Sequence, residues 1–84
     1  MSKRAAFTDQ AKADLRAIPQ PFALQILRTL ARFLDSGEGN VKRLKDIEPP
    51  LYRLRSQDHR VFFRVLSLEE IEIIRVRDRK DAYR

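Results

Sequence analysis

The 84-residue chain contains no cysteine and no tryptophan, one histidine and two glycines. Without cysteine it can form neither a disulfide nor a thiolate metal site, which fits a reducing compartment. A zinc site takes about four His, Cys or acidic ligands, so a single histidine argues against one. Two glycines are too few for a glycine-rich phosphate-binding loop. The sequence therefore predicts a protein without metal or other cofactor.

Long hydrophobic runs are also missing. No apolar segment approaches the roughly 20 residues that a membrane-spanning helix needs, and the first ten residues lack the apolar segment of a signal peptide. Hydrophobic residues nevertheless make up 43% of the chain, which is enough for a packed core. We therefore expect one cytoplasmic domain spanning residues 1–84, with no membrane partner.

Positive charge is the dominant feature of what is present. Lys and Arg number 18 against 12 Asp and Glu, which gives a formal charge of +6, and 13 of the 18 cations are Arg. The planar guanidinium suits bidentate contacts to phosphate or carboxylate. We expect an anionic partner, although a solvated basic surface is the simpler alternative.

The first half of the chain reads as helical. Arg4 to Phe7 can form a short strand, and Thr8 is a typical N-cap for a helix from Asp9 to Ile18. Pro19 ends that helix, and a broad apolar stripe predicts a second helix from Gln20 to Asp35. So short a connection predicts a helical hairpin.

The second half reads as strands. Ser36 to Pro50 is rich in Gly, Asn and Pro and predicts a loop. Three segments then alternate with period 2, namely Leu51–Ser56, Arg60–Leu66 and Ile71–Arg77. Their short connections predict an antiparallel meander. The predicted fold is therefore α+β, in the order β-α-α-β-β-β, with the helical hairpin on one face of the sheet.

A pairing scheme follows from the short turns. If Arg55 lies opposite Arg60, and Leu66 opposite Ile71, alternation sorts the strand residues onto two faces. The helix-facing side is apolar apart from Glu72 and carries Tyr52, Leu54, Val61, Phe63, Val65, Ile74 and Val76. The open side carries Arg53, Arg55, Arg60, Phe62, Arg64, Arg75 and Arg77, with Leu66, Ile71 and Ile73 at its far end.

This scheme places Arg55, Arg60 and Arg77 in one row across three strands, and we expect Arg60 to be exposed there. Like charges directly opposite one another cost on the order of 0.2–1 kcal/mol each. Two interpretations remain open. The arginines are solvated and partnered by carboxylates such as Asp58 and Asp78, or they form an anion site that suits a phosphate backbone.

Two further side chains have more than one interpretation. A turn after the last strand can bring Tyr83 over the arginines, where its ring can stack on a base or its hydroxyl exchange a proton. It can equally close the edge of the core. His59 is predicted at a hairpin tip, where side chains are normally solvent-exposed.

Four segments, taken in order, resemble a known family: Val41–Lys45, Pro50–Arg55, His59–Arg64 and Ile73–Tyr83. With the short strand and helical hairpin before them, they resemble the RelE/ParE superfamily of bacterial type II toxin–antitoxin toxins, and within it the RelE-like branch. This resemblance covers nearly the whole chain and implies the RelE-like microbial RNase fold.

The resemblance implies two activities. RelE-like members are metal-independent endoribonucleases that cut messenger RNA, usually in the ribosomal A site, and so inhibit translation. ParE-like members inhibit DNA gyrase and lack the nuclease residues. Both kinds are held inactive by a cognate antitoxin. For this chain the implied partners are messenger RNA, the ribosome and an acidic antitoxin in a hetero-oligomer; a gyrase inhibitor and a catalytically inactive basic binding module remain alternatives.

The resemblance also assigns site residues. It gives catalytic roles to Arg60, to Arg77 or Arg79 near the end of the last strand, and to Tyr83. RNA or phosphate binding falls to Arg53, Arg55, Lys42, Arg43 and Lys45. His59 is a candidate auxiliary residue, and no residue is assigned to a metal. Some relatives carry a dedicated acid–base pair, but here the nearby His59, Asp58, Asp78 and Asp81 match it poorly, so the general acid stays unassigned.

Overall fold

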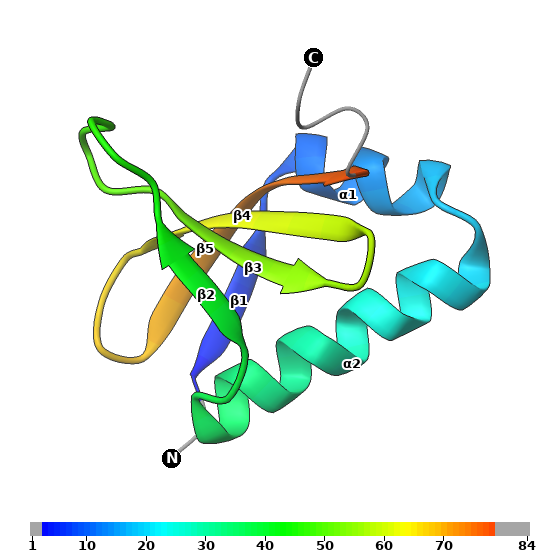
Figure 1. Ribbon diagram of the computed structural model, residues 1–84, viewed down its shortest axis with the longest axis horizontal. Coiled ribbons are helices and arrows are strands. Elements are labelled where there is room, and N and C mark those ends of the chain that lie inside the picture. The colour runs from blue at the N-terminus through cyan, green and yellow to red at the C-terminus, as the bar shows by residue number, and fades with distance from the viewer. Residues whose placement is uncertain (1–2, 79–84) are drawn as a thin grey trace.

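Two helices follow a short first strand, and four further strands complete the described chain (Figure 1). The computed structural model describes residues 3–78, so the predicted site residues Arg79 and Tyr83 lie outside the described range. The elements are β1 (Arg4–Phe7), α1 (Asp9–Ala17), α2 (Gln20–Ser36), β2 (Asn40–Arg43), β3 (Tyr52–Ser56), β4 (His59–Val65) and β5 (Glu70–Asp78).

The helical hairpin is confirmed, and local signals set its boundaries. The Thr8 hydroxyl accepts a hydrogen bond from the Ala11 N–H at 3.1 Å and donates one to the Ile74 carbonyl at 2.9 Å, so this cap also attaches α1 to β5. The second helix starts after Pro19 and ends at Gly37, whose φ of 78° lies in the left-handed region. Glycine reaches that region without the penalty that a Cβ imposes.

The five strands form one sheet in the order β1-β5-β4-β3-β2. The first strand runs parallel to β5, while the other neighbours are antiparallel, so the predicted meander is confirmed. Both helices lie on one side of the sheet (Figure 1). The hydrophobic core between the helices and the sheet contains Ala11, Ile26, Leu30, Leu54, Val61, Phe63, Ile71, Ile73 and Val76. Within residues 3–78, the other side of the sheet therefore has no helix packed on it.

The prediction of a loop from Ser36 to Pro50 is wrong in part, because Asn40–Arg43 forms the edge strand β2. All four residues of β2 are exposed, so the strand has no alternation of apolar and polar residues to reveal it. Gly39 permits the close approach: a Cβ there would lie 2.8 Å from Leu54 Cδ1. The edge strand therefore depends on a tertiary contact that its own sequence does not specify.

The predicted pairing of β4 with β5 is correct in one half and wrong in the other. Arg60, Val61 and Phe62 face their predicted partners Arg77, Val76 and Arg75. A bulge after Phe62 then shifts the register by one residue, so Val65, and not Leu66, lies opposite Ile71. The extra residue is on β5, between Ile73 and Arg75.

The bulge reverses the faces predicted for the start of β5. Ile71 and Ile73 are fully buried in the core, whereas the alternation predicted them on the open face. Glu72, predicted to face the helices, instead lies opposite Arg64. Burying an isoleucine stabilises the fold by roughly 1.5–3 kcal/mol, which explains why the chain adopts the irregular register.

Candidate functional site

An arginine face occupies the side of the sheet opposite the helices. We define it by Arg53, Arg55, Arg60, Phe62, Arg64, Arg75 and Arg77. The predicted row is confirmed, since Arg60 on β4 lies opposite Arg55 on β3 and Arg77 on β5. A second row lies beside it, with Phe62 between Arg53 and Arg75. Lys42 on β2 continues this row, because it pairs with Arg53.

Arg60 itself is buried, with only 6% of its surface exposed, so the prediction that it is exposed is wrong. The strand β4 is the central strand of five, and Arg60 has a long arginine directly opposite on each side. A charge with little water around it interacts more strongly with an approaching anion than an exposed charge does.

The neighbouring arginines have hydrogen-bond donors to spare. Arg55 is exposed, and its Nε donates to the Gln57 carbonyl at 3.1 Å. A terminal nitrogen of Arg53 donates to Asn40 Oδ1 at 3.3 Å. The Nε atoms of Arg53 and Arg64 are buried and have no hydrogen-bond partner in the described structure. Unsatisfied buried donors are costly, so an anionic ligand that reached them would gain from them.

Asp14 of α1 holds the outer edge of the arginine face in place. One of its carboxylate oxygens, Oδ2, accepts from Arg75 Nε at 3.0 Å and from the Val76 N–H at 2.9 Å. Burial raises the pKa of this carboxyl, but the hydrogen bonds from Val76, Gln10 and Arg75 and the charge of Arg75 together lower it below the ordinary 3.8. The helix thus satisfies a backbone donor on β5 and fixes one guanidinium. The sequence offered no signal for this contact.

Replacing Asp14 by Asn is expected to lower the free energy of unfolding at pH 7 by about 1–2 kcal/mol, because charge-assisted hydrogen bonds are lost. A carboxyl with a lowered pKa in the folded state contributes its full stabilisation above its ordinary pKa. That contribution disappears as the pH falls through the folded value, below 3.8. Urea unfolding at pH 7 and near pH 3 should therefore show a smaller acid-induced loss for Asp14→Asn than for the unmodified protein. Equal losses would contradict this role.

His59 is buried, so the prediction of a solvent-exposed side chain at the hairpin tip is wrong. It is the first residue of β4, and its neighbour Arg60 faces the opposite side, so His59 lies on the helix side of the sheet. Its ring is 5.8 Å from that of Phe22 on α2, and its Nε2 lies 3.8 Å from Asp78 Oδ2. Strand alternation therefore separates His59 from the arginine row. An auxiliary role for it remains a prediction.

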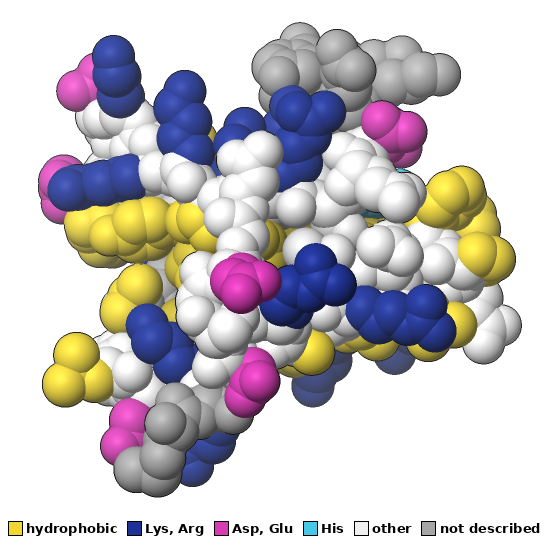
Figure 2. Space-filling view, turned by 60° about the horizontal axis from the view of Figure 1, so that its bottom comes forward, with side chains coloured by type: hydrophobic (Ala, Val, Ile, Leu, Met, Phe, Trp, Pro, Cys, Tyr) yellow, Lys and Arg dark blue, Asp and Glu magenta, His cyan; other side chains and the backbone are white. Residues whose placement is uncertain are grey.

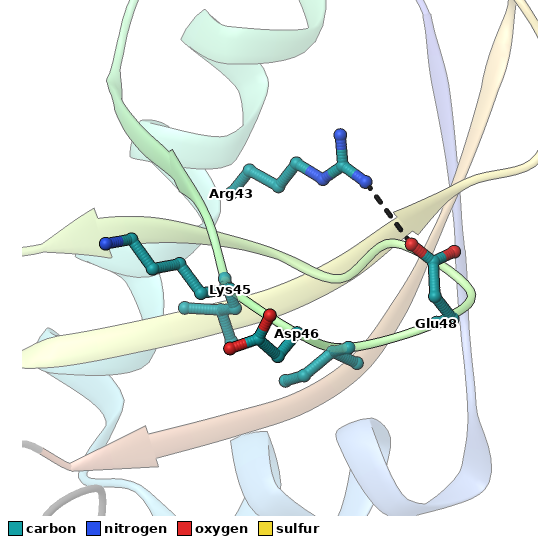
Figure 3. Close-up of a pocket in the computed structure, with 6 residues that line it drawn as sticks. Arg43, Lys45, Asp46 and Glu48 are labelled. Atoms are coloured by element: carbon teal, nitrogen blue, oxygen red, sulfur yellow. Dashed lines mark ion pairs between the residues drawn. The ribbon is translucent and has the colours of Figure 1, made fainter.

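The basic segment before β3 divides between the two faces. Lys42 shares the arginine face by its pairing with Arg53, whereas Arg43 pairs with Tyr52 and so lies on the other side. In Figure 3 Arg43 points toward Glu48, with 3.6 Å between Arg43 and the carboxylate, while Lys45 points away from that pair. Residues 43–48 line an open hollow of about 580 Å³. It belongs to this loop and not to the arginine row.

The molecular surface is rich in basic side chains. In Figure 2 several Lys and Arg side chains stand along the upper edge and others lie across the middle of the view, while hydrophobic side chains gather mainly at the left and right ends.

Within residues 3–78, neither helix is long and apolar enough to cross a membrane. No three His, Cys, Asp or Glu side chains of that range are grouped as a metal site would require.

Comparison with solved structures supports the RelE-like fold. The RelE–RelB complex from Pyrococcus horikoshii OT3 superimposes with a TM-score of 0.74 at 22% identity, covering 94% of this chain and 97% of that one. The RelB–RelE antitoxin–toxin complex from Methanococcus jannaschii gives 0.74 at 22% identity, with 93% and 94% coverage. A mutant of the E. coli toxin RelE in the free state gives 0.75 at 21% identity, with 99% and 90% coverage.

Comparison at the level of sequence is more specific. A search of curated proteins finds no match. A family model described as "ParE toxin of type II toxin-antitoxin system, parDE" matches residues 5–83, nearly the entire chain. The chain therefore belongs to the ParE toxin family of type II toxin–antitoxin systems.

Proposed function

We propose that this toxin is an endoribonuclease that cleaves messenger RNA on the ribosome and so inhibits translation. The observation that carries the proposal is the row of Arg55, Arg60 and Arg77 across three strands. Three arginines paired across neighbouring strands, the central one buried, would form a site for a phosphodiester whose negative charge increases during reaction. The similarity of the fold to RelE toxins agrees with this assignment.

The proposed reaction uses the RNA's own 2′-hydroxyl as nucleophile. Its oxygen attacks the adjacent phosphorus and the bond from phosphorus to the 5′-oxygen breaks, leaving a 2′,3′-cyclic phosphate and a 5′-hydroxyl. Arg60 and Arg77 stabilise the charge on the phosphate oxygens, together with Arg79 beyond the described residues. Arg53 and Arg55 position the backbone. Tyr83 accepts the 2′-proton, and the departing 5′-oxygen takes up a proton from water.

An acidic antitoxin is the proposed inhibitor. The solved relatives from Pyrococcus and Methanococcus are toxin–antitoxin complexes, and this chain carries a formal charge of +6. A negatively charged segment that covers the arginine face would block RNA binding and neutralise the positive charge of the arginine row. Its affinity should fall as salt is added, because exposed charge pairs are screened.

Gyrase inhibition is the second candidate. The matching family model is described as ParE toxin of parDE, and the resemblance implies gyrase inhibition for ParE-like members. In that case the arginine face would contact protein or DNA without cleaving either. The two candidates predict different products and can be separated directly.

Primer extension on a defined message in a translating extract tests the proposal, with a gyrase supercoiling assay in parallel. We expect new 5′ ends within the message only when active toxin and ribosomes are both present, and unchanged supercoiling. An Arg60→Met variant is the control for contaminating nuclease. Intact message together with loss of supercoiling would replace the proposal by gyrase inhibition.

A further inference from the structure

Phe62 is an aromatic residue at the centre of the arginine face. Its pairing places Arg53 opposite on β3 and Arg75 opposite on β5. Alternation places Arg60 and Arg64 on the same face, two residues before and after it on β4. Four arginines thus surround one phenyl ring, which lies on the side away from the helices and is half-buried.

The guanidinium groups around this ring are not equivalent. Asp14 holds Arg75 through Nε at 3.0 Å, which neutralises part of its charge. Arg53 and Arg64 each have a buried Nε with no hydrogen-bond partner in the described structure. Directly opposite positions bring Cβ atoms within about 5.5 Å, and positions two apart on a strand lie about 7 Å apart. A ligand over the ring would therefore lie beside the side chains of Arg53 and Arg64, which share its face of the sheet.

An aromatic ring among arginines suits a ligand with a flat apolar surface and negative charge beside it. An unpaired nucleotide has both, in its base and its phosphate. Aromatic side chains on a basic sheet stack against the faces of bases, and each such stack typically contributes tenfold or more to affinity. A phenyl ring offers no hydrogen-bonding group, so it would accept any base. Phe62 also lies one row from Arg60 and Arg77, where the scissile phosphate is proposed to bind.

We propose that Phe62 is the stacking platform for an unpaired RNA base beside the scissile phosphate, with Arg53 and Arg64 binding the flanking phosphates. This inference rests on the proposed function, since it takes RNA as the ligand. It adds a base-binding subsite to a row of arginines that recognises only the backbone. The subsite is tolerant of sequence because it reads the face of a base and not its edge.

The absence of tryptophan from the chain provides a direct probe. A Phe62→Trp variant has a single indole at the proposed subsite, and a stacked base should quench its fluorescence. The ligand is a short single-stranded RNA with 2′-O-methyl groups, which block cleavage. We expect quenching on titration, and much weaker quenching with an abasic oligonucleotide of the same length and charge.

Affinity measurements on further variants complete the test. Phe62→Leu should bind the intact oligonucleotide about tenfold more weakly and the abasic one about as well as the unmodified protein does, while Phe62→Tyr should bind both normally. Leu68→Ala, at a residue 91% exposed in the β4–β5 turn, is the matched control and should change nothing. Should Phe62→Leu fail to fold, the comparison of intact and abasic RNA with Phe62→Trp still decides.

Two negative outcomes are distinguishable. Normal binding of intact RNA by Phe62→Leu, with equal quenching of Phe62→Trp by intact and abasic oligonucleotides, would overturn the stacking role and leave the proposed function standing. If the unmodified protein bound no RNA and cleaved no message on the ribosome, the proposed function and this subsite would both be overturned.

Discussion

Expression of the Arg60→Met variant is expected to leave bacterial growth unimpaired, whereas expression of the unmodified toxin without antitoxin should arrest it. The guanidinium of Arg60 is proposed to stabilise the phosphate in the transition state, and loss of one such donor typically costs about 10²–10³-fold in rate. Methionine keeps most of the buried aliphatic volume while removing the charge. Repulsion from Arg55 and Arg77 also disappears, which offsets the loss of the interaction that Arg60 makes, so the melting temperature should change little.

Growth curves and thermal melts of the same variants provide the measurement. Arg28→Met is the matched control, because Arg28 is an exposed arginine on α2, on the helix side of the sheet. It should preserve both growth arrest and melting temperature. A large fall in melting temperature for Arg60→Met would show that the buried guanidinium is structural. Undiminished growth arrest would remove Arg60 from the site.

Elements with local signals were predictable from the sequence. Thr8 and Pro19 set the start and end of α1 through contacts within a few residues, and Gly37 ends α2 for the same reason. The turn at Gln57 and Asp58 fixes the pairing of Arg55 with Arg60, because a two-residue connection leaves little freedom in register. The whole fold class followed from these few local rules.

Features that depend on the sum of distant contacts were not predictable. The bulge in β5 exists because it buries Ile71 and Ile73 and places Glu72 beside Arg64, a balance that strict alternation cannot represent. The edge strand β2 exists because a partner strand is available to it, although its own residues are all exposed. Both features lie outside what a pattern of period 2 can specify.

The candidate site shows the same division. The arginine row was predictable because it lies near the first hairpin, on the regular side of the bulge. The burial of Arg60 was not, because alternation assigns a residue to a face of the sheet but does not say how much of that residue the rest of the chain covers. The contact of Asp14 with Arg75 joins residues 61 positions apart and left no trace in the sequence pattern. Strand pairing thus revealed which arginines share a face, but not how each is held.

Replacing Tyr83 by Phe is expected to slow cleavage of ribosome-bound message by about 10²-fold or more, the usual scale for a positioned acid–base group. Tyr83 lies outside the described residues, so this prediction rests on the family resemblance and on the chemistry of the phenol. In the proposed site Tyr83 acts beside guanidinium groups, and positive charge generally favours a phenolate, which could accept the 2′-proton. The change removes only the hydroxyl, so affinity for RNA should remain nearly the same.

Single-turnover cleavage, measured beside RNA affinity for each variant, separates the roles open to Tyr83. A proton-transfer role predicts that Tyr83→Phe and Tyr83→Ala are both slow, with only the alanine variant weaker in binding. A stacking or packing role predicts that Tyr83→Phe behaves normally while Tyr83→Ala does not. Normal cleavage by Tyr83→Phe would exclude the phenol as the general base. Arginine stays protonated and cannot replace it as the base. Charge stabilisation by the arginine row would then be the principal source of catalysis.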